Sequence, residues 1–166
     1  MKIENLRELF IHELLDLYSA EKQIIEALPK MEEKAASPQL RQAFRQHLQQ
    51  TQMQKQRLDR IFDQLQDPDV DRDDETCKGI KGIIDENEKL IKDAKDADTR
   101  DAGMIAGAQR VEHYEISVYG TARTYASLLG RQEWANLLQQ TLDEEKETDV
   151  LLTDLAKRIN VEAKAA

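Results

Sequence analysis

The chain has 166 residues, 40% hydrophobic and 34% charged, which is enough for one compact domain with its own core. Its 33 acidic and 24 basic residues give a net charge of -9, which disfavours sequence-independent binding to nucleic acid. Only 6 glycines and 3 prolines argue against a many-turned β architecture and favour long helices. A single cysteine, Cys77, excludes an internal disulfide and any metal site built from several cysteines.

No apolar run approaches the length needed to cross a bilayer, and acidic residues interrupt the region where a signal peptide would be apolar. We therefore expect a cytoplasmic protein with no membrane segment. The chain has no Gly/Ser-type linker, so residues 1–166 are expected to form one domain. Within it we expect an acidic linker at about 66–75 and a frayed tail at about 160–166.

The first two helices are predicted from apolar residues that recur every three or four positions. The first stripe runs from Ile3 to Leu28, and its end is marked by Pro29 and then by the residues before Pro38. Ser37 suits the N-cap of the second helix, with Pro38 at its first position. The second stripe contains Leu40, Phe44, Leu48, Thr51, Leu58, Phe62 and Leu65.

Three further helices are predicted downstream. A shorter third helix is expected over about 75–95, and Asp98 or Thr99 can cap a fourth, which stops at Gly130 before the fifth begins. Short links join the first helix to the second and the fourth to the fifth, so each pair is expected to form an antiparallel hairpin. The predicted fold is an all-α four-helix bundle of two hairpins, with the remaining helix in the crossover connection.

Acidic side chains interrupt the apolar stripes where the bundle core should be. Glu21 falls on the inward face of the first helix, Glu112 and Glu115 on that of the fourth, and Glu145 and Asp149 on that of the fifth. A buried carboxylate without a partner is costly. These groups therefore need a shared cation, shared protons or water.

Hairpin register predicts that these acids meet one another. A turn that pivots near Gly130 sets Glu115 level with Glu145. A first turn that pivots near residue 33 brings Glu21 and His47 within about two residues of the same level, or roughly 3 Å along the helix axis. Carboxylates and imidazole between facing helices are the ligands that a di-iron or di-manganese site requires.

Five stretches taken together resemble the YciF/YciE-type stress proteins of the ferritin-like superfamily, over nearly the whole chain. They are FIHELLDLYSAEKQ (10–23), FRQHLQQT (44–51), CKGIKGIIDE (77–86), VEHYEISVYG (111–120) and LDEEKETD (142–149). The resemblance implies a ferritin-like, rubrerythrin-type bundle that is often a homodimer and is linked to stress responses. It implies no assigned reaction and no small-molecule substrate.

The resemblance also implies a metal site for one or two ions of iron or manganese. Together with the histidine found from helix register, the candidate ligands are Glu21, His47, Glu112, Glu115, Glu145 and Asp149. The second helix departs from the family pattern H-L-x-E-T, because it reads HLQQT and has Gln50 where glutamate is usual. No acidic residue occurs from Lys34 through Arg57, so at least one anionic ligand is missing and a second ion should bind weakly.

Two hypotheses follow from these patterns. In the first, the protein binds iron or manganese and either reacts with oxygen or peroxide or sequesters the metal. In the second, it is a non-catalytic homodimer that acts structurally or by protein association, and its inward acids share protons or water.

Several residues have a plainer structural interpretation. Glu21 could instead join a hydrogen-bonded network with Tyr18, His47 or Lys55. The small residues around Gly103 and Gly107 allow close approach either of another helix or of a second subunit. For Cys77 we favour ordinary packing over a redox role.

Overall fold

The computed structural model describes residues 3–68, 70–73 and 75–165, and these contain five α-helices and no β-strand. The all-α prediction is therefore confirmed. The predicted linker and tail include residues 69, 74 and 166, which lie outside the described residues. The helices are α1 (Leu6–Lys34), α2 (Pro38–Leu65), α3 (Lys78–Asp93), α4 (Ala97–Leu128) and α5 (Gln132–Ala165).

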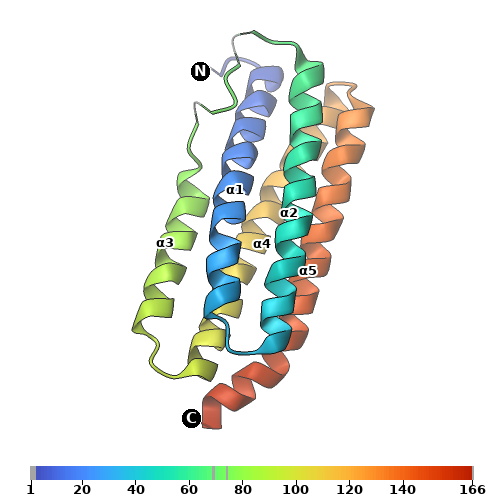
Figure 1. Ribbon diagram of the computed structural model, residues 1–166. Coiled ribbons are helices and arrows are strands. Elements are labelled where there is room, and N and C mark those ends of the chain that lie inside the picture. Colours follow the sequence, from blue (N-terminus) through green and yellow to red (C-terminus); the bar gives the residue numbers. More distant parts are fainter. Residues whose placement is uncertain (1–2, 69, 74, 166) are drawn as a thin grey trace.

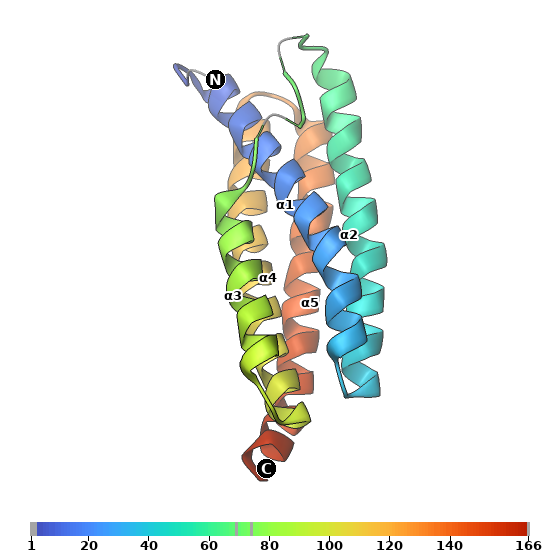
Figure 2. The ribbon, with the colours of Figure 1, turned by 60° about the vertical axis from the view of Figure 1, so that its left-hand side comes forward.

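Four long helices run side by side, α1 with α2 and α4 with α5 forming the two hairpins (Figures 1 and 2). The shorter α3 lies on the outside, against α4 and α1. This is the predicted arrangement of two hairpins with one helix in the crossover. None of the helices within the described residues is both long and apolar enough to cross a membrane.

The close contact between α3 and α4 explains the small residues of α4. A Cβ atom added to Gly103 would lie 2.2 Å from Cδ2 of Leu90, and one added to Gly107 would lie 2.2 Å from Cγ of Asn87. A larger residue at either position would therefore force the side chain of Leu90 or Asn87 to move. Of the two possibilities left by the sequence, the structure shows approach of a helix from the same chain.

Three helix ends differ from their prediction. The first helix continues through Pro29 to Lys34, because apolar packing of Leu28 and Met31 on either side outweighs the lost backbone hydrogen bond. Asp96, rather than Asp98 or Thr99, caps α4 by accepting a hydrogen bond from the Thr99 backbone N–H at 2.6 Å. The expected frayed tail is helical as far as Ala165.

The core consists of two apolar clusters, one toward each end of the bundle. One contains Phe10, Leu14, Leu58, Tyr119 and Leu138, and the stacked pair Phe10 and Trp134 belongs to it, with ring centroids 5.8 Å apart. The other contains Ile24, Phe44, Ile80, Met104 and Leu152. Along α1, α2, α4 and α5 the buried residues between the two clusters are largely polar, and we call this zone the polar layer. Its members are Glu21, His47, Thr51, Gln54, Glu112, Glu115, Glu145 and Thr148.

Candidate metal centre

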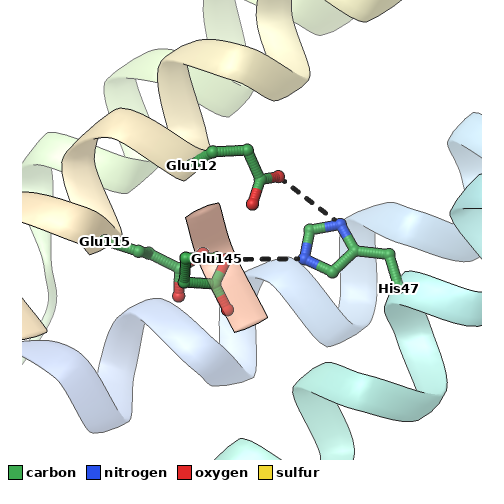
Figure 3. Close-up of side chains that lie close together, drawn as sticks. All are labelled: His47, Glu112, Glu115 and Glu145. Carbon is green, nitrogen blue, oxygen red and sulfur yellow. Dashed lines mark ion pairs between the residues drawn. The ribbon is translucent and has the colours of Figure 1, made fainter. Parts of the chain in front are cut away.

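Four side chains of the polar layer converge on one point between the helices (Figure 3). His47 comes from α2, Glu112 and Glu115 from α4, and Glu145 from α5. One potential ligand atom from each lies within 4.8 Å of those of the others, and all four residues are buried. The Nδ1 atom of His47 is 3.5 Å from Glu112 Oε1, and its Nε2 atom is 3.9 Å from Glu145 Oε2.

The register of the second hairpin is the predicted one. Gly130 adopts the left-handed conformation at φ 70°, where a glycine reverses the chain without strain. Glu115 and Glu145, each fifteen residues from it, meet as expected. The three acids at this point thus come from a single hairpin, and α2 adds the imidazole.

Most of the buried polar atoms of this cluster lack hydrogen-bond partners within the described residues, the exception among the carboxylate oxygens being Glu145 Oε1, which accepts from Gln54. Both carboxylate oxygens of Glu112 and of Glu115 are unpartnered, as are Oε2 of Glu145 and Nε2 of His47. Leaving a buried polar group unsatisfied costs about 1–3 kcal/mol, and more for a charged one. So many unpartnered donor atoms at one point suit the coordination of a cation, and the alternative is protonation of the acids.

Burial favours the neutral forms of all four side chains. It raises the pKa of Glu112 and of Glu115 well above the ordinary value, and the neighbouring charge of Glu145 adds to both effects. The pKa of Glu145 is raised too, and that of His47 is lowered to about 4 by burial. A divalent cation would therefore displace protons from the carboxyl groups and would meet a neutral imidazole.

Glu21 lies beside the cluster and has a partner of its own. It is fully buried, and its Oε1 atom accepts a hydrogen bond from the hydroxyl of Tyr119, while Oε2 is unpartnered. Burial and the nearby charge of Glu145 raise the pKa of Glu21. Of the alternatives left open by the sequence, Glu21 does form a buried hydrogen bond, but its donor is Tyr119 rather than Tyr18, His47 or Lys55. Lys55 Nζ instead donates to Tyr18 Oη at 2.8 Å.

The position of the first turn explains why Glu21 is not among the four. The chain reverses at residues 35–37 rather than near 33. With that pivot, His47 lies level with residue 25, four residues or roughly 6 Å along the axis from Glu21. Thr51 is the α2 residue that faces the level of Glu21.

Asp149 lies at the margin of the polar layer, half-buried. Its Oδ1 atom accepts a hydrogen bond from Gln109 Nε2 at 2.9 Å, and its Oδ2 atom is 3.4 Å from Nε2 of the exposed His113. Its charge contributes to the raised pKa of Glu112. The structure thus places Asp149 next to the cluster but outside the group of four, and a role as ligand stays a prediction.

The second helix contributes a polar residue that the sequence analysis missed. Gln54 is fully buried and donates hydrogen bonds from Nε2 to Glu145 Oε1 and, at 3.1 Å, to Glu144 Oε2, while its own carbonyl oxygen is unpartnered. The signal was the spacing, because Gln54 continues the three-and-four-residue steps through His47 and Thr51 to Leu58. Gln50 is only half-buried, and its Oε1 atom lies 3.5 Å from Thr148 Oγ1.

An ion pair anchors the outer side of this network. Both guanidinium N–H groups of Arg57 donate to the Glu144 carboxylate at 2.6 Å, and Arg57 also donates to Thr141 Oγ1 at 3.1 Å. Glu144 is partly buried by this pair, while Glu147 is exposed. The arrangement holds Gln54 and hence Glu145 in place.

The donor set fits a hard divalent cation. Three carboxylates and one imidazole suit iron or manganese, which accept oxygen and nitrogen ligands together. Cys77 lies apart from this set, at the N-cap of α3, where its thiol contacts Tyr114 Oη at 3.1 Å and Asp16 Oδ2 at 3.3 Å. Burial raises the pKa of that thiol, which is in keeping with packing.

The fold and this centre define a class of all-helical proteins with a buried histidine–glutamate cluster between four bundle helices. Residues 5–165 match the family described as a domain of unknown function, DUF892. The chain belongs to this family. It is 42% identical to Protein YciF of Escherichia coli strain K12 over 165 residues, which cover 99% of this chain and 98% of that protein.

Solved structures agree with the family assignment. The crystal structure of the Escherichia coli stress protein YciF is 41% identical with a TM-score of 0.89, covering 95% of this chain and 98% of that one. YcfI of Rhodopseudomonas palustris, provisionally described as a structural protein, is 38% identical with a TM-score of 0.86, covering 92% and 95%. A Xanthomonas campestris protein, XCC3681, is 20% identical with a TM-score of 0.71, covering 98% and 100%, and is similar in fold alone.

Proposed function

We propose that this protein is a ferritin-like, stress-related metal protein that holds iron or manganese in its polar layer. His47, Glu112, Glu115 and Glu145 would be the ligands, with Glu21 and Asp149 beside them. The observation that carries the proposal is the convergence of unpartnered, buried nitrogen and carboxylate oxygen atoms at one point. A bound ion would supply exchange of electrons with oxygen or peroxide, or would itself be the stored species.

The protein's own part is to provide charge and to exclude water. The apolar clusters on both sides of the polar layer lower the polarity around the site, which strengthens the attraction between carboxylate and cation. Gln54, held by Glu144 and Arg57, orients Glu145 through its amide N–H. The missing acid on α2 supports one well-held ion and a second that is weak or absent.

Metal analysis tests this proposal directly. Protein reconstituted anaerobically with Fe(II) or Mn(II) and then desalted should retain about one ion per chain, measured by elemental analysis. Glu115→Gln keeps the size of the side chain but removes its charge, and should weaken Mn(II) binding at least tenfold. Glu147→Gln, a matched change at an exposed position of α5, should leave it unchanged.

Adding charge gives the converse test. Gln54→Glu would place a further carboxylate against Glu145 and should tighten Mn(II) binding. Retention of no metal by the wild-type chain and by Gln54→Glu would overturn the proposal.

A second candidate function is supported by the uncharged side chains that α2 contributes to the polar layer. His47, Thr51 and Gln54 face the acids with no charge of their own, and one relative is provisionally described as structural. In this case the protein would act by association and its acids would hold protons. Gln54→Glu would then lower stability at neutral pH, and added metal would not restore it.

We further propose a single domain that assembles as a cytoplasmic homodimer. The match of one family over residues 5–165 supports the single domain. Exposed apolar side chains on α5, namely Val150, Leu151 and Val161, support association. Sedimentation equilibrium of the metal-free protein should give twice the chain mass, and a monomer at all concentrations would refute the dimer.

A further inference from the structure

A cavity of about 290 Å³ lies between α1, α3 and α4 and reaches inward to His47 and Glu112, at the edge of the candidate metal centre. It arises because α3 is held close to α4 by Gly103 and Gly107 and contacts α1 less extensively. Only Ile80 and Asn87 of α3 are fully buried. The apolar side chains that line the cavity include Ile24, Leu28, Ile83, Ile84, Ile91 and Val111.

The two ends of the cavity differ in chemistry. At the inner end lie His47 and Glu112, so that an occupant would sit beside the polar layer. Three exposed lysines, Lys30, Lys34 and Lys92, also line it, and Glu88 is the acid that lines the cavity beside them. This is a locally positive rim on a chain whose net charge is -9.

The lysines of the rim are held only by weak contacts. Lys30 Nζ lies 3.2 Å from Glu88 Oε1, and Lys34 Nζ lies 3.6 Å from the neighbouring Glu33. Exposed ion pairs of this kind contribute at most about 1 kcal/mol, so an incoming anion can compete for the ammonium groups. The rim therefore offers a site for an anionic head group above an apolar interior.

We propose that this cavity binds a single amphiphile with an anionic head group and one unbranched alkyl chain, of the class of a free medium-chain carboxylate. The head group lies at Lys30, Lys34 and Lys92, and the chain extends inward between α1 and α3. A water molecule occupies about 30 Å³ of liquid and a methylene is of similar size, so the volume suits roughly eight to twelve carbons. The proposed binding needs no metal ion, so metal-free protein tests it separately from the metal centre, although His47 and Glu112 border both.

Calorimetry with metal-free protein tests the alkyl part of the proposal. Decanoate, used below the concentration at which it forms micelles, should bind one molecule per chain. Each methylene added between hexanoate and decanoate should tighten the Kd by up to about fourfold, the value of burying a CH₂ group. Equal affinity for hexanoate and decanoate, or no binding of either, would overturn the proposal.

Charge variants test the head group. The triple change Lys30→Gln, Lys34→Gln and Lys92→Gln should weaken decanoate binding several-fold and leave that of uncharged decanol unchanged. A matched control is Lys89→Gln with Lys95→Gln, which are exposed lysines that do not line the cavity. An equal loss in both sets would refute a head-group site at the rim.

Filling the cavity tests its location. Ile84→Trp changes a partly buried position of α3 and should abolish decanoate binding while the circular dichroism spectrum stays helical. Ala27→Leu on the opposite wall serves the same purpose should the first variant not fold. Full decanoate binding by a folded, filled variant would overturn the proposal.

The wild-type protein and the Ile84→Trp variant also test two other possible occupants of the cavity, a membrane surface and a second copy of the chain. Vesicles of phosphatidylglycerol should not sediment the protein, and sedimentation without decanoate binding would point to a membrane surface instead. Likewise, a change of oligomeric state in Ile84→Trp without decanoate binding would show that a second copy covers this face. Either result would refute the proposal.

Discussion

The polar layer and the apolar clusters on either side of it are built on the same helical faces with opposite chemistry. Along α2, for example, Leu40 and Phe44 are followed on the inward face by His47, Thr51 and Gln54, and then by Leu58. All of these are buried, and the spacing of three and four residues does not change. The helical period therefore decides which residues face inward, and the side-chain type decides what that zone can do.

The difference also divides stability from function. The apolar clusters gain free energy by removing carbon from water, whereas the polar layer loses it by burying acids without partners. The bundle tolerates the polar layer because apolar packing continues on both sides of it. Because the polar layer lowers the stability of the metal-free protein, binding of a cation there can raise the stability more than binding elsewhere.

Truncation within an apolar cluster should have the largest effect. Phe44→Ala removes a buried ring and should lower the free energy of unfolding by about 3–5 kcal/mol, measured by urea denaturation. Because Phe44 is not a candidate ligand, the loss should be the same with and without Mn(II). A loss that Mn(II) largely reverses would mean that the two zones are not independent.

The opposite change within the polar layer should stabilise the metal-free protein. Glu115→Leu replaces two unpartnered buried oxygens by carbon and should raise the free energy of unfolding by about 1–3 kcal/mol at neutral pH. Urea denaturation in the presence of a chelator measures it. The exposed change Glu147→Leu is the control and should have little effect. Destabilisation by Glu115→Leu would show that the acid has a partner after all.

The acids of the polar layer should make the metal-free protein less stable as pH rises. Burial raises the pKa of Glu112 and Glu115 in the folded state, so their contribution is complete below about pH 4.5 and is lost as pH rises through the folded values. For each such group, stability falls by up to about 1.4 kcal/mol per pH unit. Glu115→Leu should therefore show a shallower fall than the wild type in metal-free buffer between pH 5 and 8. Equal slopes would contradict the raised pKa of Glu115.

Mn(II) should reverse this trend. Since binding displaces protons, affinity for the ion should increase over the same pH range. Calorimetry in two buffers of different ionisation enthalpy would count the protons released. Release of none would mean that the acids are already ionised in the metal-free protein.

Much of the site could be predicted because an acid in an apolar stripe is conspicuous. Glu115 and Glu145 were found in this way, and Gly130 fixed their register, since a single short turn joins α4 to α5. Glu21 was also found, but its level depended on the first turn. Pro29 suggested an earlier end to α1 than tertiary packing allows, and the error of a few residues moved the predicted pivot.

Three other features could not be predicted from the type of residue at one position in the sequence. Gln54 is neutral and lies in a glutamine-rich helix, so nothing but its spacing marks it as buried. Asp149 lies in the expected sector of α5, yet its bond to Gln109 turns it toward the margin. The placement of α3, and with it the cavity, depends on which side of the bundle the crossover takes, and periodicity carries no information about that.

The smallest effect is expected where family pattern and geometry disagree. Gln50→Glu introduces the glutamate that the resemblance led us to expect at this position. Gln50 is half-buried, and its oxygen lies near Thr148 Oγ1, a hydroxyl that could donate to a carboxylate. The free energy of unfolding should therefore change by no more than about 0.5 kcal/mol. Its gain in Mn(II) affinity should be smaller than that of Gln54→Glu, whose carboxylate would lie at the cluster itself. Tighter Mn(II) binding by Gln50→Glu than by Gln54→Glu would mean that the polar layer rearranges around the ion. The metal, and not packing alone, would then decide where the polar layer ends and the apolar clusters begin.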